Sequence, residues 1–179
     1  VYPKIEEGVK VIADAVEKEI KRSKQAGKKC VLALGTGLSL TPIYQELVRR
    51  HKAEGLSFDN VVVFNAYEYF PLNEGTKNSS LVKLHELFLD KVDVKPENVF
   101  SFDGTIAQNM VTEHCRAYEK QIKAHGGIDI LVLGIGRRGN VATNEPGSGL
   151  TSVARLVLTD DITRNEMNMS FGAQEPVPP

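Results

Sequence analysis

The sequence has few of the features that mark specialised classes of protein. It contains two cysteines, Cys30 and Cys115, which cannot form a disulfide framework or supply a metal site alone. Its 22 basic and 23 acidic residues give a formal net charge of -1, which argues against a general nucleic-acid binder. No apolar run approaches the roughly 20 residues that span a bilayer. Residues 1–4 also lack the apolar core of a signal peptide. We therefore expect a cytoplasmic protein with no membrane or nucleic-acid partner.

The residues that are present are typical of a globular domain. Hydrophobic residues make up 41% of the chain and charged residues 25%, which argues against disorder and against a coiled coil. A length of 179 residues corresponds to one domain, on the usual scale of roughly 100–200 residues per domain. The chain does not begin with methionine, which suggests that it is a piece of a longer protein.

Short apolar runs alternate with amphipathic segments, as in a series of βαβ units. The expected strands are 30–34, 61–64, 99–102, 128–133 and 155–158. The expected helices are 4–25, 41–54, 80–90 and 106–124, with a long loop over 66–78. In the first helix, the inward face would hold Ile5, Val9, Ile12, Ala13, Val16 and Ile20. This order predicts an α/β fold with a mainly parallel sheet, whose ligand crevice lies at the carboxyl ends of the strands.

The segment Gly35-Thr36-Gly37-Leu38-Ser39 joins a predicted strand to a predicted helix. Its glycines allow a sharp turn, and a helix N-terminus offers free N–H groups to an anion. This pattern is compatible with a phosphate cradle, but it is not a Walker A loop because no Gly-Lys-Ser/Thr follows. The alternative is an ordinary strand–helix turn capped by Ser39.

Residues 134–139 match the pattern G-x-G-x-x-G after a strand, with Asp160 or Asp161 further along the chain. A dinucleotide site requires this motif to open a helix. The following residues 140–149 contain Pro146 and two glycines, which disfavour a helix. The pattern therefore gives only weak support to dinucleotide binding.

Two carboxylates, Glu68 and Glu145, lie on different crevice loops and could perform acid–base chemistry if they converge. The alternative for each is a hydrogen-bonded loop carboxylate. The other titratable residues have simpler interpretations. The four histidines show no metal-ligand spacing, both cysteines are expected to be inert, and the pair Arg49-Arg50 suits a solvated helix end.

Three segments, in this order, resemble the glucosamine-6-phosphate deaminase/isomerase family, which is related to the 6-phosphogluconolactonases. Where the family has T-G-[SG]-[ST]-P, residues 36–40 read TGLSL. Where it has F-N-M-D-E-Y, residues 64–69 read FNAYEY. Where it has G-x-G-x-D-G-H-I-A-F-N-E-P-[GA]-S, residues 134–148 read GIGRRGNVATNEPGS. The run Asn144–Ser148 favours the deaminase branch, and the resemblance makes the G-x-G-x-x-G match a coincidence.

The resemblance implies a Rossmann-like three-layer α/β sandwich and a sugar-phosphate site. It implies that Gly35, Thr36, Gly37, Leu38 and Ser39 hold the phosphate, with Gly136 beside them. It also implies that the Asp of D-E-Y moves a proton at C2. The His of D-G-H would open the sugar ring, supported by the neighbouring Asp and by the Glu of N-E-P, which is Glu145 here.

The sequence departs from the family at the catalytic positions. The base Asp is replaced by Tyr67, the ring-opening His by Asn140, and its Asp neighbour by Arg138. Tyrosine has an ordinary pKa near 10 and asparagine does not titrate. Each lost acid–base group costs about 10²–10⁴ in rate. Of the catalytic set, Glu145 remains, with Glu68 beside the replaced base.

We therefore expect residues 1–179 to form one family domain that lacks the C-terminal part of the family fold. It would bind a sugar phosphate of the hexosamine 6-phosphate class at a degenerate site, with Arg138 as an added anion contact and with no metal or cofactor. Two alternatives are an active deaminase/isomerase and a non-catalytic module of a longer carbohydrate-metabolism protein. A homo-oligomer and fusion to another domain are further open alternatives.

Overall fold

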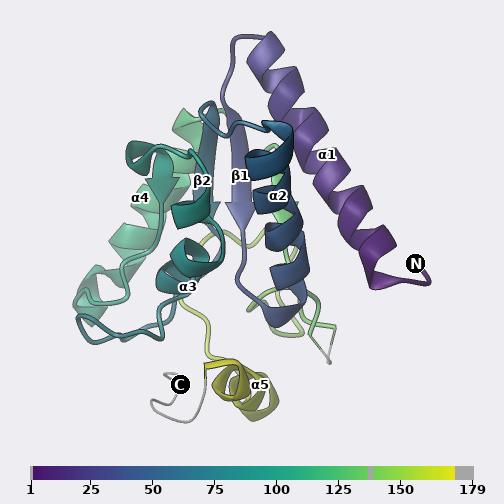
Figure 1. The fold of residues 1–179 in the computed structure, drawn as a ribbon. Helices are drawn as coiled ribbons and strands as arrows, with labels where there is room; N and C mark the ends of the chain where they lie inside the picture. The colour runs from purple at the N-terminus through teal and green to yellow at the C-terminus, as the bar shows by residue number, and fades with distance from the viewer. Residues whose placement is uncertain (1, 137–138, 172–179) are drawn as a thin grey trace.

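The computed structural model describes residues 2–136 and 139–171 (Figure 1). Its sheet has four parallel strands in the order β3-β2-β1-β4. The strands are β1 (Cys30–Leu34), β2 (Val61–Asn65), β3 (Val99–Phe100) and β4 (Ile130–Val132). The predicted α/β fold with a parallel sheet is confirmed, although β3 and β4 are shorter than the apolar runs suggested.

Five α-helices precede, connect or follow these strands in the described residues: α1 (Ile5–Gln25), α2 (Thr41–Glu54), α3 (Ser80–Leu87), α4 (Val111–Ala124) and α5 (Asp161–Phe171). Figure 1 shows α1 and α2 on one side of the strands and α4 on the other, with α5 beyond the end to which the arrow of β1 points. Within the described part of the chain, no helix is long and apolar enough to cross a membrane.

The central strands are buried on both faces, which explains their continuous apolar sequence. Alternate residues such as Leu32, Leu34 and Val63 face the larger core, which includes side chains of α1, α2 and α3. The residues between them, such as Ala33 and Phe64, face a smaller cluster with Tyr118 of α4 and others. The molecule therefore has three layers, with helices on both faces of the sheet.

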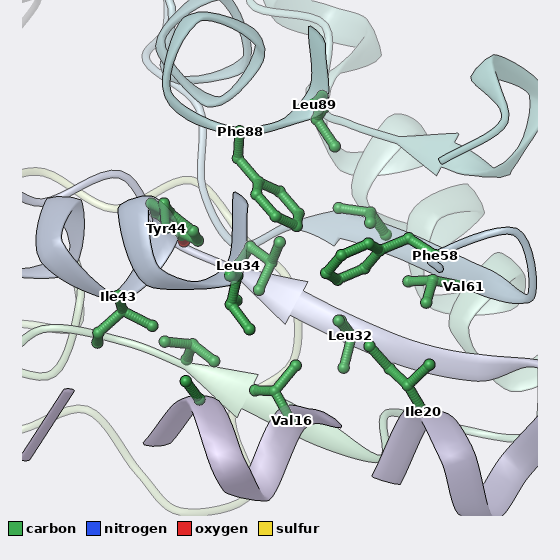
Figure 2. Close-up of a cluster of buried hydrophobic side chains, with 14 of the residues drawn as sticks. Val16, Ile20, Leu32, Leu34, Ile43, Tyr44, Phe58, Val61, Phe88 and Leu89 are labelled. Atoms are coloured by element: carbon green, nitrogen blue, oxygen red, sulfur yellow. The ribbon is translucent and has the colours of Figure 1, made fainter. Parts of the chain in front are cut away.

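Aromatic rings fill the middle of the larger core (Figure 2). Phe88 lies between Tyr44 and Phe58, with ring centroids 5.4 Å and 5.2 Å from theirs. The Tyr44 hydroxyl is also fully buried, and it donates a hydrogen bond to the carbonyl of Gly35. This bond links the core to the loop that follows β1.

Helix α1 packs on the sheet through only part of the face that its sequence predicts. Ala13, Val16 and Ile20 are buried as expected. Ile5 and Ile12, however, are 73% and 38% exposed, so these two predictions were wrong. The periodicity identifies the apolar stripe of a helix but does not show how much of its length has a neighbour to pack against.

The region after residue 149 differs from the prediction. Residues 155–158, expected as a strand, have no regular secondary structure, and Leu156 and Leu158 are exposed. No strand among the described residues pairs with this segment, so its apolar pattern has no sheet edge to join. Helix α5 was not predicted because its sequence, DITRNEMNMSF, carries few strongly apolar residues.

Glu68 defines the start of α3 from the loop that follows β2. Its carboxylate accepts hydrogen bonds from the backbone N–H groups of Ser80 and Leu81, at 2.7 Å and 3.0 Å. The Ser79 hydroxyl donates to the same carboxylate at 2.6 Å and accepts from the Val82 N–H at 3.3 Å. The first N–H groups of α3 are thus satisfied by groups of the chain itself.

Arg50 is buried at the contact between α1 and α2, contrary to the expectation of a solvated helix end. It is 5% exposed. Its guanidinium pairs with Asp14, Glu17 and Glu46 at 2.7, 2.7 and 2.8 Å. The neighbouring Arg49 has a side chain that is 51% exposed, so the two adjacent arginines have different environments. Three nearby carboxylates are what allow the Arg50 charge to be buried.

We expect Arg50→Met to lower the free energy of unfolding by about 2–3 kcal/mol, because it leaves three neighbouring carboxylates without their shared cation. Arg49→Met is the matched control and should have a much smaller effect, since that side chain is exposed. Urea unfolding of both variants at neutral pH measures the difference. Equal losses of stability would contradict this account of Arg50.

The same cluster predicts a dependence of stability on pH. Hydrogen bonds from Arg49 and Arg50 lower the pKa of Glu46 from its ordinary value of 4.5 to about 2. The stabilisation is therefore present above pH 4.5 and is lost as the pH falls toward 2, where the folded state also binds the proton. Urea unfolding at a series of acidic pH values should show this loss, and the free energy of unfolding should change less steeply with pH in Arg50→Met than in the wild type. An equal dependence on pH in the two proteins would contradict the role given to Arg50.

Candidate active site

A cleft of about 360 Å³ opens at the carboxyl ends of β1 and β4. The chain runs from β1 to β2 and β3 in one direction across the sheet, and β4 then pairs with the other edge of β1. The strand order therefore reverses between β1 and β4, and open α/β sheets bind ligands outside the carboxyl ends of the strands at such a point. The described residues that line the cleft are Gly35–Leu40, Tyr67, Tyr69, Lys83, Leu133–Gly136, Asn140, Ala142, Thr143, Thr163 and Met167.

The predicted anion-binding residues meet in this cleft. Gly35, Thr36, Gly37, Leu38 and Ser39 form one wall, and Gly136 lies on the loop opposite. Two of the substituted family positions, Tyr67 and Asn140, also line it. Arg138, predicted as an added anion contact, lies outside the described residues.

In the loop after β4, Gly136 and Asn140 approach each other closely. The Gly136 N–H donates to the Asn140 carbonyl at 2.9 Å, and the Asn140 side-chain amide donates to the Ala142 carbonyl at 3.0 Å. A methyl group added at Gly136 would overlap the Asn140 side chain. Residues 139–160 contain no helix, so the described part of the glycine-rich segment does not open one and the structural condition for a dinucleotide site is not met.

A chain of hydroxyl groups runs from the cleft into the protein. The Tyr67 hydroxyl lies 3.0 Å from the Thr36 hydroxyl, which lies 2.9 Å from that of Ser80. Ser80 donates to the side-chain oxygen of Asn65 at 3.2 Å. The Asn65 amide in turn donates to Ser101 at 3.0 Å. This chain connects the two loops that carry the first two family motifs.

The end of this chain sets the direction of every hydrogen bond in it. The Asn65 oxygen can only accept, so Ser80 uses its one hydroxyl hydrogen there. Thr36 must then donate to Ser80, and Tyr67 must donate to Thr36. Burial also raises the pKa of the Tyr67 phenol above its ordinary value. Tyr67 is therefore a neutral hydrogen-bond donor at neutral pH and cannot act as a carboxylate base would.

Lys83 is a cleft residue that sequence analysis missed. It lies on α3, three residues after Ser80, and is half-buried. Burial lowers the pKa of its ammonium group, while the nearby Glu86 opposes that shift. Among the described residues that line the cleft, Lys83 is the one basic side chain, and none is an aspartate, glutamate or histidine. Helical spacing from Ser80 was the available signal, but it required knowing that Ser80 contacts Thr36 in the wall of the cleft.

Neither of the two carboxylates predicted as catalytic is among the described residues that line the cleft. Glu68 borders another hollow of about 370 Å³ and accepts the N-terminal hydrogen bonds of α3. Glu145 lies further along the loop that follows β4. One of its oxygens accepts weakly from the Asp160 N–H at 3.4 Å, and the other is buried without a hydrogen-bond partner among the described residues. The structure thus does not bring these carboxylates together.

The remaining candidate groups lie elsewhere. His51, His85, His114 and His125 do not line the cleft. The described residues contain no group of three or more His, Cys, Asp or Glu side chains arranged to hold a metal ion. Both cysteines are buried and free, and burial raises the pKa of the Cys30 thiol to about 12. A thiol with so high a pKa is a poor nucleophile at neutral pH.

Comparison with known proteins agrees with the resemblance in the sequence motifs. Residues 3–170 match the family model of glucosamine-6-phosphate isomerases and 6-phosphogluconolactonases. A glucosamine-6-phosphate deaminase-like protein of Bacteroides thetaiotaomicron is 50% identical over 178 residues, which cover 99% of this chain and 27% of that protein. A glucosamine-6-phosphate deaminase of an Arthrobacter species is 40% identical over 166 residues, covering 93% of this chain and 62% of that enzyme.

Solved structures show the same relationship. A monomeric glucosamine-6-phosphate deaminase matches with a TM-score of 0.88 and 31% identity, covering 97% of this chain and 70% of that chain. The 6-phosphogluconolactonase of Thermotoga maritima shares the fold with a TM-score of 0.61 at 18% identity.

The chain spans about a quarter of the Bacteroides relative and about three-fifths of the Arthrobacter enzyme. The family match nevertheless covers nearly all of this sequence and includes both loops that form the cleft. Together with the parallel α/β fold, it shows that the chain belongs to the family of glucosamine-6-phosphate isomerases and 6-phosphogluconolactonases.

Proposed function

We propose that this chain binds a sugar phosphate of the hexosamine 6-phosphate class in the cleft between the loops that follow β1 and β4. We propose also that its site is degenerate, so that it does not carry out the family deaminase reaction at an ordinary enzymatic rate. The family match and the similarity to glucosamine-6-phosphate deaminases support the class of ligand.

The absence of acid–base groups from the described lining of the cleft supports a degenerate site. The described residues that line the cleft include no carboxylate and no imidazole. Moving a proton between carbons of a sugar requires a base within hydrogen-bond reach, and opening a sugar ring benefits from an acid. Tyr67 and Asn140 occupy the positions where the family resemblance implies these groups. Tyr67 remains protonated at neutral pH, and Asn140 has no titratable proton.

The anion-binding half of the site retains the features that a sugar phosphate requires. The glycine-containing loop 35–39 leads through a short 3₁₀ turn into α2. Ser39 extends from this turn toward the opposite loop, since its hydroxyl oxygen lies 3.1 Å from the position that a Cβ on Gly134 would occupy. A volume of about 360 Å³ lies within the range of small-molecule sites. The cleft is therefore suited to bind a ligand that it is poorly equipped to transform.

A second candidate function is a sugar-phosphate reaction that uses Glu145. One oxygen of this residue is buried without a hydrogen-bond partner among the described residues, which favours this function because a carboxylate oxygen without a partner is costly to bury. A substrate hydroxyl would satisfy that oxygen. In this alternative, Glu145 is the acid or base, and Glu68 positions α3 through its hydrogen bonds to the helix N-terminus.

We propose a cytoplasmic location, no cofactor, and fusion to another domain. The fusion is supported by the Bacteroides relative, because the match to this chain covers only 27% of that longer protein. A homo-oligomer is an open alternative that size-exclusion chromatography can test.

We expect glucosamine 6-phosphate to bind the chain with measurable heat in titration calorimetry, while ammonia release stays close to the uncatalysed rate. The reason is that the anion loop is present but the cleft lacks a carboxylate or imidazole among its described lining residues. Ammonia release at an ordinary enzymatic rate would contradict the degenerate site. Absence of both heat and a thermal shift would instead favour a non-catalytic structural module.

Restoring the family groups provides a second test. We expect Tyr67→Asp with Asn140→His to raise ammonia release by roughly 10²-fold over the wild type, since each acid–base group contributes about 10²–10⁴. Each single variant should give less, because groups that act together are not additive. Tyr67→Phe is the control and should leave the rate unchanged. If the double variant binds the sugar phosphate but its rate does not rise, the site has lost more than these two groups.

A further inference from the structure

Tyr44 of α2 holds the start of the anion loop, residues 35–39, from within the core (Figure 2). Its side chain is fully buried, and its hydroxyl donates a hydrogen bond to the Gly35 carbonyl. Tyr44 is the fourth residue of α2, the helix into which the loop leads through the 3₁₀ turn Leu38–Leu40. This hydrogen bond therefore joins the two ends of a segment that contains the whole loop.

Gly35 is also held from the side of the sheet. Its N–H donates to the Val132 carbonyl of β4 at 3.1 Å. A Cβ at this position would lie 3.4 Å from atoms of the Leu133 and Leu40 side chains and 3.5 Å from the Tyr67 ring. The loop therefore leaves the sheet from an enclosed residue with both backbone groups engaged, one by β4 and one by α2.

The middle of the loop offers hydrogen-bond donors. The N–H groups of Gly37, Leu38 and Ser39 donate to no group in the described part of the chain. Their directions follow from the path of the backbone between Gly35 and α2. Because donors that are already aimed bind a ligand without the entropy cost of ordering them, a fixed path favours anion binding.

A second buried tyrosine makes the same kind of hydrogen bond at the next strand. Tyr118 of α4 donates its hydroxyl hydrogen to the carbonyl of Asn65, the last residue of β2, at 2.6 Å. Helix α4 covers the face of the sheet opposite to α2 (Figure 1). Neither Tyr44 nor Tyr118 is among the described residues that line the cleft, so each acts on a ligand there through the strand end that it holds. The end held by Tyr44 is the one that leads into the anion loop.

We propose that Tyr44 is a positioning residue for the phosphate group of the ligand, because its hydrogen bond to Gly35 keeps the anion loop in its binding shape before the ligand arrives. This inference rests on the proposed function, since it concerns the same ligand at the same loop. Burial raises the pKa of the Tyr44 phenol, so its hydroxyl remains a donor at neutral pH. Tyr44 takes no part in proton transfer and acts on the ligand through the loop alone.

Amide hydrogen exchange of the ligand-free chain tests whether the hydroxyl holds the loop. Tyr44→Phe removes the hydroxyl and retains the ring, whose centroid lies 5.4 Å from that of Phe88. We expect the Gly35 N–H to exchange about 2- to 10-fold faster, relative to the Leu32 N–H in the middle of β1, because local opening then breaks one hydrogen bond fewer. Tyr118→Phe is the matched control and should leave this ratio as in the wild type. An unchanged ratio in Tyr44→Phe would show that the hydroxyl does not hold the loop.

Titration calorimetry with inorganic phosphate and with glucosamine 6-phosphate tests the effect on binding. We expect Tyr44→Phe to weaken the binding of both by about 2- to 10-fold, since the loop must then be ordered when the ligand binds. Tyr118→Phe should bind both like the wild type, even where it lowers the melting temperature as much as Tyr44→Phe does. Sucrose, which favours the folded state, allows the same comparison if a variant is only partly folded.

The outcomes separate this inference from the proposed function. If the wild type binds and Tyr44→Phe binds equally well, Tyr44 does not position the loop for phosphate, while the proposed function stands. If Tyr118→Phe loses as much affinity as Tyr44→Phe, the effect is one of general stability and the inference is wrong. If the wild type binds neither ligand, the proposed function fails and the positioning role fails with it, whatever the exchange of the Gly35 N–H shows.

Discussion

Strand β1 is hydrogen-bonded to a neighbouring strand along each edge, and the position of the whole cleft follows from this pairing. On one side, Cys30–Leu34 pair in register with Val61–Asn65 of β2, and on the other, Leu32–Leu34 pair with β4. All of these pairs are parallel, so the loops after β1, β2 and β4 leave the sheet at the same end. The bonds from Gly35 to Val132 and from Ala66 to Leu34 continue the pairing into these loops. A change in the register of β1 would therefore displace every wall of the cleft.

The hydroxyl chain shows how a tyrosine is accommodated at position 67. A carboxylate at this position would accept hydrogen bonds, whereas the Tyr67 phenol donates one. The Asn65 oxygen at the other end of the chain directs the Ser80 hydrogen to itself and the Thr36 hydrogen to Ser80, which leaves the Thr36 oxygen able to accept from Tyr67. The phenol therefore fits the chain as a donor, at a position where the family resemblance implies a base.

Much of the fold could be predicted because strands such as Cys30–Leu34 are buried on both faces, and burial requires an apolar sequence. The loop positions of Thr36, Gly136 and Asn140 followed from those strands and from the family motifs. Arg50 and Lys83 could not be predicted in the same way. The burial of Arg50 depends on carboxylates of α1, far away in sequence, and the place of Lys83 in the cleft depends on the contact of Ser80 with Thr36. Such contacts between distant segments leave no local pattern.

The capping of α3 by Glu68 also limits where the protein could hold an anion. The first N–H groups of this helix donate to Glu68 and Ser79, so its partial positive charge is neutralised within the protein. An anion in the cleft would find no unsatisfied N–H group at the start of α3. The helix start that remains for it is that of α2, into which the glycine-containing loop 35–39 leads.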